Sequence, residues 1–479
     1  MTNLPDAKAV IASTAISSKE ISAIYIALIT TMALAGLDQS IVATALPRIA
    51  ADLGGMTKLS WIVTAYALAS TATMPLYGKL SDQYGRKPLI YVAIITFLAG
   101  SMLCGLAQDM TQLIIFRAIQ GIGAGGFLPL AQIVIGDLIP PAERGRRQGS
   151  IAAVFAITSV IGPVLGGFLT DALSWHWIFY VNMPIGALAL YLIARSMHGV
   201  VRTHSHQIDY LGSVLLIGSI TAALLVLALG GTEWPWHSYQ VRFTLLLALG
   251  MATALLFHVR RVPEPVLPPE LFHSRVFNVG SIVLALTFVG MMGSSVFFPM
   301  LFQNVMGVSP ANSGLLTMPL MAGMVISSMA NGRLMSRGGQ RYKSIQVVGL
   351  SMATFAFAAL AWGIERSAGY LIIEPAIFVL GAGLGLVTPN MTIMVQSALP
   401  ASRRGVGTAM LGFFRSLGGV VGVTGSGAIV ALQMHNRLAS AELYRHAIAN
   451  IFILGTVMVA LALGTLFFLP ELPLAQSEK

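Results

Sequence analysis

The sequence predicts an all-α membrane protein made of two six-helix bundles and an inserted pair of helices, with fourteen transmembrane helices in all. Of the 479 residues, 56% are hydrophobic and only 10% are charged, and the mean hydropathy is +0.79. This is more apolar surface than the core of a water-soluble protein needs. Apolar runs of roughly 20 residues, long enough to cross a bilayer, recur along nearly the whole chain. A further observation is an internal repeat.

The repeat consists of glycine, proline and arginine residues that occur twice, 260 positions apart. Two like halves that face one another across a bilayer are the usual arrangement of a secondary transporter, so the repeat predicts a protein of this kind. The first copy contains Gly121, Gly123, Gly125, Pro129, Arg144, Gly145, Gly162 and Gly167, and the second contains Gly381, Gly383, Gly385, Pro389, Arg404, Gly405, Gly422 and Gly427.

The predicted transmembrane helices form two matching sets of six and one unmatched pair. The first set is expected at residues 22–46, 59–78, 88–107, 112–136, 150–171 and 177–196. The second set is expected at residues 277–303, 312–332, 344–364, 370–396, 406–432 and 449–469. Two further apolar runs, 209–230 and 241–258, have no counterpart in the repeat and are expected to form a hairpin between the halves.

These spans divide the chain into five parts. Residues 1–21 carry charges but no apolar segment or cleavage site, so they are expected to form a cytoplasmic tail rather than a cleaved signal. The other parts are an N-terminal six-helix bundle at 22–200, an inserted transmembrane hairpin at 201–265, a C-terminal six-helix bundle at 266–470 and a cytoplasmic tail at 471–479.

The distribution of positive charge orients the chain. With a cytoplasmic N-terminus, seventeen Lys and Arg residues fall in inner loops and six in outer positions, as the positive-inside rule requires. Topology therefore accounts for the formal net charge of +10, and the scatter of these residues over short loops argues against a nucleic-acid partner. The expected location is a bacterial inner (plasma) membrane, with both termini in the cytoplasm and membrane lipids around the spans.

Few residues suit an enzyme or a metal site. Cys104 is the only cysteine and lies in an apolar run, so no internal disulfide can form and thiolate metal chemistry is not expected. The nine histidines lie mostly in loops at no metal-ligand spacing, and the chain has no G-x-x-x-x-G-K-[ST] loop for a nucleotide. We expect no cofactor and no enzymatic activity; a membrane enzyme or a non-transporting sensor is the alternative from another class.

The loop between the second and third spans reads Gly78-Lys-Leu-Ser-Asp82-Gln-Tyr-Gly85-Arg86-Lys87. It resembles the signature loop of the major facilitator superfamily, which implies the major facilitator fold. In that family the glycine lets the helix approach the other half, and the acid faces the positive N-terminal end of a partner helix and locks the outward-open state. The resemblance assigns gating roles to Gly78, Asp82, Gly85 and Arg86, and Asp137 is the expected partner of Arg86.

The second half contains a degenerate copy of this loop, from Gly332 to Arg341, in which Ser336 replaces the acid. Of the two loops, only the one in the first half would then carry an acid that can lock the halves together. Gln83 stands where arginine is common in the family, which is a departure from the pattern. The alternative role for Asp82 is that it only caps a turn.

Three further stretches resemble the drug:proton antiporter branch of that superfamily, whose members have fourteen spans. They are Leu37 to Pro47 in the first span, Arg117 to Gly123 in the fourth, and Gly162-Pro163-Val-Leu-Gly166-Gly167 in the fifth, which resembles the antiporter motif. The resemblance covers most of residues 30–190. It implies proton-driven export of lipophilic or cationic compounds.

Asp38 and Arg117 are the first-half charges that lie well inside a span. A charge at that depth costs roughly 2.5 to 3.5 kcal/mol on insertion scales, so neither side chain should face lipid. We expect both to face one cavity, where Asp38 would take up and release a proton and Arg117 would favour its ionised form. A proton and a cationic substrate would then compete for this carboxylate. The alternative is an ion pair that only fixes helix packing.

The glycines of the fifth span have a structural role as well. Gly162 and Gly166 have the small-x-x-x-small spacing that permits close contact between helices. We expect this contact to join the two halves. Pro163 should add a bend, and the resemblance links that bend to exchange rather than uniport.

Two charges of the second half complete the candidate site residues. Arg415 lies within a span, and Glu374 lies near the outer end of another, directly before Pro375. Glu374 is a candidate second proton or cation site, with a solvated helix start as the alternative.

The predicted function is a proton-coupled antiporter that exports small amphiphilic or cationic compounds by alternating access, with protons as the coupling ion. Export of one dedicated small solute by the same mechanism is the alternative within transport.

Overall fold

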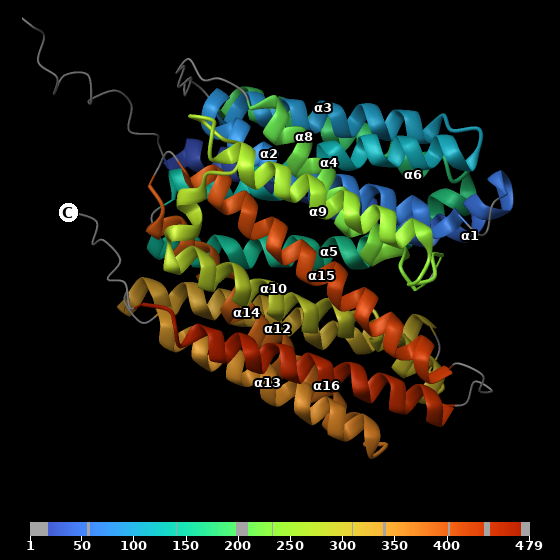
Figure 1. Cartoon of the computed structure of the whole chain (residues 1–479). Helices are drawn as coiled ribbons and strands as arrows, with labels where there is room; N and C mark the ends of the chain where they lie inside the picture. Colours follow the sequence, from blue (N-terminus) through green and yellow to red (C-terminus); the bar gives the residue numbers. More distant parts are fainter. Residues whose placement is uncertain are drawn as a thin grey trace, which may run out of the picture.

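The computed structural model describes residues 18–54, 58–139, 141–197, 209–231, 233–308, 310–338, 342–400, 403–434 and 441–470. The predicted tails at 1–21 and 471–479 lie almost wholly outside these ranges, as does the start of the predicted hairpin segment at residues 201–208. Within the described residues the fold is helical (Figure 1), which confirms the predicted all-α class.

The helices of the first half are α1 (Ser18–Leu53), α2 (Leu59–Tyr84), α3 (Arg86–Gly105), α4 (Met110–Leu138), α5 (Pro141–Ala172), α6 (Trp177–Tyr180) and α7 (Asn182–Ser196). The hairpin consists of α8 (Tyr210–Leu229) and α9 (Tyr239–Val259), and the 3₁₀ helix η2 (Pro269–His273) follows it. The second half contains α10 (Arg275–Ser295), α11 (Phe298–Met300), the π-helical turn η3 (Leu301–Val305), α12 (Pro310–Gly338), α13 (Tyr342–Glu365), α14 (Tyr370–Ala398), α15 (Arg404–Met434) and α16 (Ala441–Leu466).

Thirteen helical segments in the described part of the chain are long and apolar enough to cross a membrane. The fourteenth predicted span corresponds to α2, which has 26 residues and is therefore about 39 Å long, but which is not among the thirteen. Ser70, Thr71 and Thr73 lower the hydropathy of this helix, and all three are buried against protein. The Thr73 hydroxyl donates to the carbonyl of Ala69 at 2.8 Å and so satisfies its own hydrogen-bonding need.

The repeated glycines make equivalent contacts in the two halves. A Cβ on Gly121 would collide with the backbone of α2, and a Cβ on Gly381 would collide with the backbone of α12. In the same way Gly123 lies against the backbone of α3 and Gly383 against that of α13. The repeat in the sequence is therefore a repeat of helix packing, in which α4 and α14 occupy the same place in their bundles.

The two halves meet along two pairs of helices. Helix α2 packs along α15, and α5 packs along α12. Each half therefore contributes one helix from near its start and one from near its end to the contact. In Figure 1 the first half, in blue and teal, lies above the second half, in gold to red, and α15 crosses between them. The hairpin packs on this seam from outside, through contacts of α8 with α2 and α15.

Asp209 ties the hairpin to the rest of the protein. It caps α8 by accepting from the Gly212 N–H at 2.8 Å, and it also accepts from the Val266 N–H at 3.1 Å and contacts His258 Nε2 at 2.6 Å. Burial acts to raise the pKa of Asp209, but the bonds from His258, Gly212 and Val266 outweigh burial and hold this pKa below its ordinary value. One carboxylate thus joins the start of α8, the end of α9 and the linker to α10.

Candidate functional site

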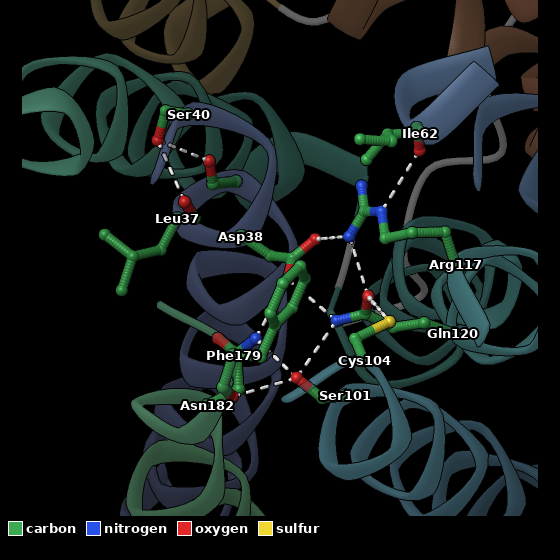
Figure 2. Close-up of polar contacts among 11 residues, drawn as sticks. Leu37, Asp38, Ser40, Ile62, Ser101, Cys104, Arg117, Gln120, Phe179 and Asn182 are labelled. Carbon is green, nitrogen blue, oxygen red and sulfur yellow. Dashed lines mark hydrogen bonds and ion pairs between the residues drawn. The ribbon is translucent and has the colours of Figure 1, made fainter. Parts of the chain in front are cut away.

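An ion pair lies inside the first bundle, where α1 and α4 face one another. Arg117 Nη1 donates to Asp38 Oδ2 at 2.7 Å, and the two side chains are 1% and 0% exposed. An unpaired charge in such a position would be very costly, and removal of one partner of a buried pair typically destabilises a protein by about 3–5 kcal/mol. The structure therefore brings together the two charged residues that the sequence predicted to be neighbours (Figure 2).

Two amide side chains complete the surroundings of the Asp38 carboxylate. Its Oδ1 accepts from Gln120 Nε2 at 2.7 Å and from Asn182 Nδ2 at 2.9 Å. Both amide groups also donate to the Ser101 hydroxyl oxygen, at 3.2 Å and 2.9 Å, and Ser101 in turn donates to the carbonyl of Phe179. Figure 2 shows these groups converging on Asp38 from α3, α4 and α7. All four side chains are buried.

The guanidinium of Arg117 also contacts residues of α2 and α4. Its Nε donates to the carbonyl of Ile62 on α2 at 3.2 Å, and its Nη1 also donates to Gln120 Oε1 at 2.7 Å. The ring of Tyr66 lies 4.2 Å from the guanidinium carbon, a cation–π contact. Arg117 thus connects the carboxylate on α1 with two positions on α2.

This arrangement suits an ionised carboxylate. Asp38 accepts hydrogen bonds from Arg117, Gln120 and Asn182, and an ionised carboxylate is an acceptor only. In this conformation both side chains are enclosed by protein, so the prediction that Asp38 and Arg117 face one cavity stays a prediction for other states of the protein. The pair can be enclosed because each charge is satisfied by protein groups and needs no water.

Sequence reasoning did not identify Gln120, Asn182 and Ser101 as partners of Asp38. Gln120 could have been found, since it lies three residues after Arg117 and so shares its helix face. Asn182 and Ser101 could not, because their approach depends on how α3 and α7 are rotated about their axes. Cys104 lies beside this network, and its thiol contacts Gln120 Oε1 at 3.8 Å.

A second cluster joins the two halves at the end of the bundle where α2 turns into α3. Asp82 Oδ1 accepts from the Gly405 N–H at 3.2 Å, and Asp82 Oδ2 accepts from the Val406 N–H at 2.9 Å. These amides belong to the first turn of α15, where the helix dipole favours a negative charge. Gly78 lies so close to Gly405 that a Cβ would collide with its carbonyl. We call this contact between Asp82 and α15 the latch.

Arg86 and Asp137 support the latch from the first half. Arg86 Nη1 donates to Asp82 Oδ1 at 2.6 Å, and Arg86 Nε donates to Asp137 Oδ2 at 3.0 Å, so the predicted pair is present. Gly85 has φ 91° and ψ 163°, a conformation that favours glycine. Burial raises the pKa of Asp82 above its ordinary value, despite the opposing effects of Arg86 and the Val406 N–H.

The copy of this loop in the second half is only partly visible. Helix α12 ends at Gly338, and Gly339 and Arg341 lie outside the described residues, as does the side chain of Ser336. The prediction that the second lock is uncharged therefore stays a prediction.

The glycines of α5 contact a different helix from the one that was predicted. A Cβ on Gly162 would collide with Ser40, and a Cβ on Gly166 would collide with Thr44 and approach the Ile41 carbonyl to 2.9 Å. Both partners belong to α1 of the same bundle, so the expectation that these glycines join the halves is wrong. The spacing predicts a close contact but does not say with which helix.

The next residues of the α5 motif differ from these two glycines. Gly167 has no atom within 4 Å of where its Cβ would be, so it makes no close helix contact. Pro163 lies inside α5, as predicted. In the second half, Gly422 of α15 makes the contact that corresponds to Gly162, against the backbone of α10 at Val289.

Glu374 and Arg415 lie in the second bundle, away from the Asp38 pair. Glu374 is in the second turn of α14, and its Oε1 is buried without a hydrogen-bond partner. Arg415 lies within α15 with its guanidinium carbon 5.2 Å from the centre of the Phe288 ring. The predicted site residues therefore occupy several separate places: the buried pair, the latch, the α5 motif and these two second-half positions.

Comparisons with known proteins agree with this architecture. Residues 28–423 match the family model described as the Major Facilitator Superfamily. The chain is 37% identical to the multidrug transporter protein MdtP of Bacillus subtilis over 86% of its own length and 75% of that protein. It is 36% identical to multidrug resistance protein 3 of the same organism, over 85% and 79% of the two chains. Among solved structures, a double tryptophan mutant of XylE superposes with a TM-score of 0.69 at 15% identity, covering 95% of this chain and 97% of that one.

Proposed function

We propose, from the premise that this chain belongs to the Major Facilitator Superfamily, that it is a proton-coupled antiporter that exports lipophilic compounds by alternating access. Members of this family with this fold are non-enzymatic membrane transporters, and the relatives in Bacillus subtilis are named as multidrug proteins. The observation that carries the proposal of proton coupling is the wholly enclosed Asp38–Arg117 pair.

Protonation of Asp38 would disturb the whole network. A neutral carboxyl has lost the charge that balances Arg117, and one of its oxygens becomes a donor facing the amide groups of Gln120 and Asn182. The uncompensated guanidinium then costs several kcal/mol unless its surroundings rearrange. A proton at this position therefore favours a different arrangement of the helices, which is what coupling to an ion requires.

Helix α2 provides a path from the proton site to the latch. Its Ile62 carbonyl accepts from Arg117, and the same helix carries Asp82, which holds the first turn of α15. A rearrangement of Arg117 would act on one end of α2 and reach the contact between the halves at the other end. We propose that α2 is the element whose position the proton would bias.

The proposed transport cycle depends on which side of the membrane the latch faces. The excess of Lys and Arg in the loops at the latch end supports a cytoplasmic position for it and for both termini. With the latch closed, a proton entering from outside would neutralise Asp38 and favour opening toward the cytoplasm. Loss of that proton to the cytoplasm, with uptake of a compound, would favour closure again and export.

The enclosed position of Asp38 changes one part of the predicted mechanism. A cationic substrate cannot bind directly to Asp38 in this conformation, because Arg117 and two amides already occupy its oxygens. The proposed role of Asp38 is therefore proton exchange, and the compound binds elsewhere between the halves.

Everted membrane vesicles containing the full chain test the proposal. With an imposed pH gradient, we expect wild-type vesicles to accumulate a neutral or charged lipophilic dye, and the Asp38→Asn variant to lose this accumulation. Asp171→Asn is the matched control, because Asp171 is an exposed carboxylate at the end of α5. Dye exchange without a gradient should survive in Asp38→Asn, which shows that it folds. Gradient-driven accumulation by Asp38→Asn equal to that of wild type would refute proton coupling at this residue.

A further inference from the structure

Arg415 is a positive charge within a membrane span that the proposed proton cycle does not use. It lies in the middle of α15 and is partly exposed. Within the described part of the chain it has no carboxylate partner and no hydrogen bond, and its only specific contact is the face of the Phe288 ring at 5.2 Å. By contrast, Arg117, the arginine within a span of the first half, is paired with Asp38.

The surroundings place Arg415 at the seam between the halves. Ser416, the next residue, has its hydroxyl 3.8 Å from the sulfur of Met74 on α2. A Cβ on Gly412, three residues before Arg415 and on the same helix face, would lie 3.7 Å from the same sulfur, and a Cβ on Gly419 of that face would lie 3.1 Å from Met292 of α10. The face of α15 that carries Arg415 therefore lies between α2 of one half and α10 of the other. The apolar side chains of Met74, Met292 and Phe288 lie along this face.

No acid among the described residues forms an ion pair with this arginine. Asp38 is enclosed and satisfied by Arg117, and Glu374 makes no ion pair in the described structure. A lone guanidinium inside a span is costly, so an unpaired arginine there points to a functional role. The place that corresponds to it under the 260-residue repeat is Phe155, so the charge is particular to the second half.

We propose that Arg415 is the counter-charge for an acidic group on the exported compound, and that the substrates therefore include amphiphilic organic anions. The inference rests on the proposed export function. A guanidinium binds a carboxylate or sulfonate through two parallel hydrogen bonds, while Phe288, Met74 and Met292 offer polarisable apolar surface to a lipophilic body. Among the residues that the structure describes, no unpaired carboxylate lies beside Arg415 to bind the cations that the sequence analysis predicted.

Two dansyl probes of equal size and opposite charge test this inference. One carries a hexanoate and the other a pentylamine. Binding to the purified full chain is followed by fluorescence anisotropy, without a pH gradient. We expect wild type to bind the carboxylate probe at least tenfold more tightly than the amine probe, and Arg415→Gln to lose that preference through a tenfold or greater loss for the carboxylate probe. Arg415→Lys should retain part of it, since it keeps the charge but not the planar fork.

A control variant and two possible outcomes decide between the inference and its failure. Arg366→Gln removes an exposed arginine of the same half and should leave both affinities unchanged. Equal or tighter binding of the amine probe by wild type would overturn the inference, as would unchanged carboxylate binding by Arg415→Gln. If Arg415→Gln does not fold, the comparison of the two probes on wild type still decides. Failure of proton coupling would instead appear in the vesicle assay with Asp38→Asn and would leave this binding preference intact.

Discussion

The latch at Asp82 allows a prediction whose size can be worked out from its contacts. Asp82 accepts from two backbone amides at the start of α15, at 3.2 Å and 2.9 Å, and its side chain is 7% exposed. A hydrogen bond to a charged acceptor contributes about 1.5–3 kcal/mol, against about 0.5–1.5 kcal/mol for a neutral one. A negative charge at a helix N-terminus adds about 0.3–1 kcal/mol, and more when partly buried.

The substitution Asp82→Asn removes the charge and leaves one acceptor oxygen for two N–H groups. The losses above sum to more than 2 kcal/mol, but burial of the charge, which also raises the pKa of Asp82, offsets part of them. We expect a net cost of about 2 kcal/mol to the closed latch. At about 1.4 kcal/mol per factor of ten, this shifts the equilibrium between joined and separated ends about thirtyfold toward separation.

Distance measurements between spin labels can detect this shift. Tyr84 at the end of α2 and Glu270 in η2 are exposed residues of opposite halves near the latch, and cysteines placed there can be labelled. The native Cys104 is fully buried and should not compete for the label. The expected result for Asp82→Asn is a larger fraction of long distances than in wild type.

Asp171→Asn is the matched control for the latch experiment. This change removes an exposed carboxylate at the end of α5 that takes no part in the latch. Its distance distribution should stay close to that of wild type. If Asp82→Asn and wild type gave the same distribution, the bonds to Gly405 and Val406 would not hold the halves together, and the reasoning would fail.

Two further predictions concern stability. Gly166→Ala should lower the free energy of unfolding by about 1–3 kcal/mol, because its Cβ would collide with α1. Gly167→Ala should be neutral or stabilising by up to about 1 kcal/mol, because no atom lies within 4 Å of its Cβ position. Thermal melts compare the two variants, and equal melting temperatures would contradict this packing. Asp209→Asn should lower the melting temperature at pH 7. The pKa of Asp209 is held below its ordinary value in the folded protein, so its ionised carboxylate stabilises the fold at every pH above that ordinary pKa. The difference from wild type should shrink as the pH falls below 3.8, and a difference that is constant with pH would argue against the charge as its cause.

The sequence predicted the features of this structure that depend on periodicity and on the cost of buried charge. Apolar runs of sufficient length predicted the helices, and the energetic cost of an isolated charge in a span predicted that Asp38 and Arg117 would be neighbours. The exception among the spans is α2, whose hydroxyl residues face protein. It was predicted, like the other spans, from its apolar run at residues 59–78.

The features that the sequence did not predict depend on how the helices are rotated about their axes. The spacing of Gly162 and Gly166 correctly indicated a close helix contact, but the partner is α1 and not a helix of the second half. The amide of Asn182 reaches Asp38 only because α7 packs against α1 in one particular rotation. Nothing in the local sequence around Asn182 specifies that rotation.

The two halves share their packing but not their chemistry, and this difference bears on how one proton can drive the cycle. Under the 260-residue repeat, Arg117 and Gln120 correspond to Ile377 and Leu380, which are buried at 0% and 1% exposure. The second bundle therefore has an apolar core where the first has a charged network, and an apolar core does not respond to a proton. Helix α2 of the first bundle accepts from Arg117 at Ile62 and also carries the latch residue Asp82. In the proposed cycle, a proton would therefore change the position of α2 against the second bundle, and no second charge would have to be desolvated in the same step.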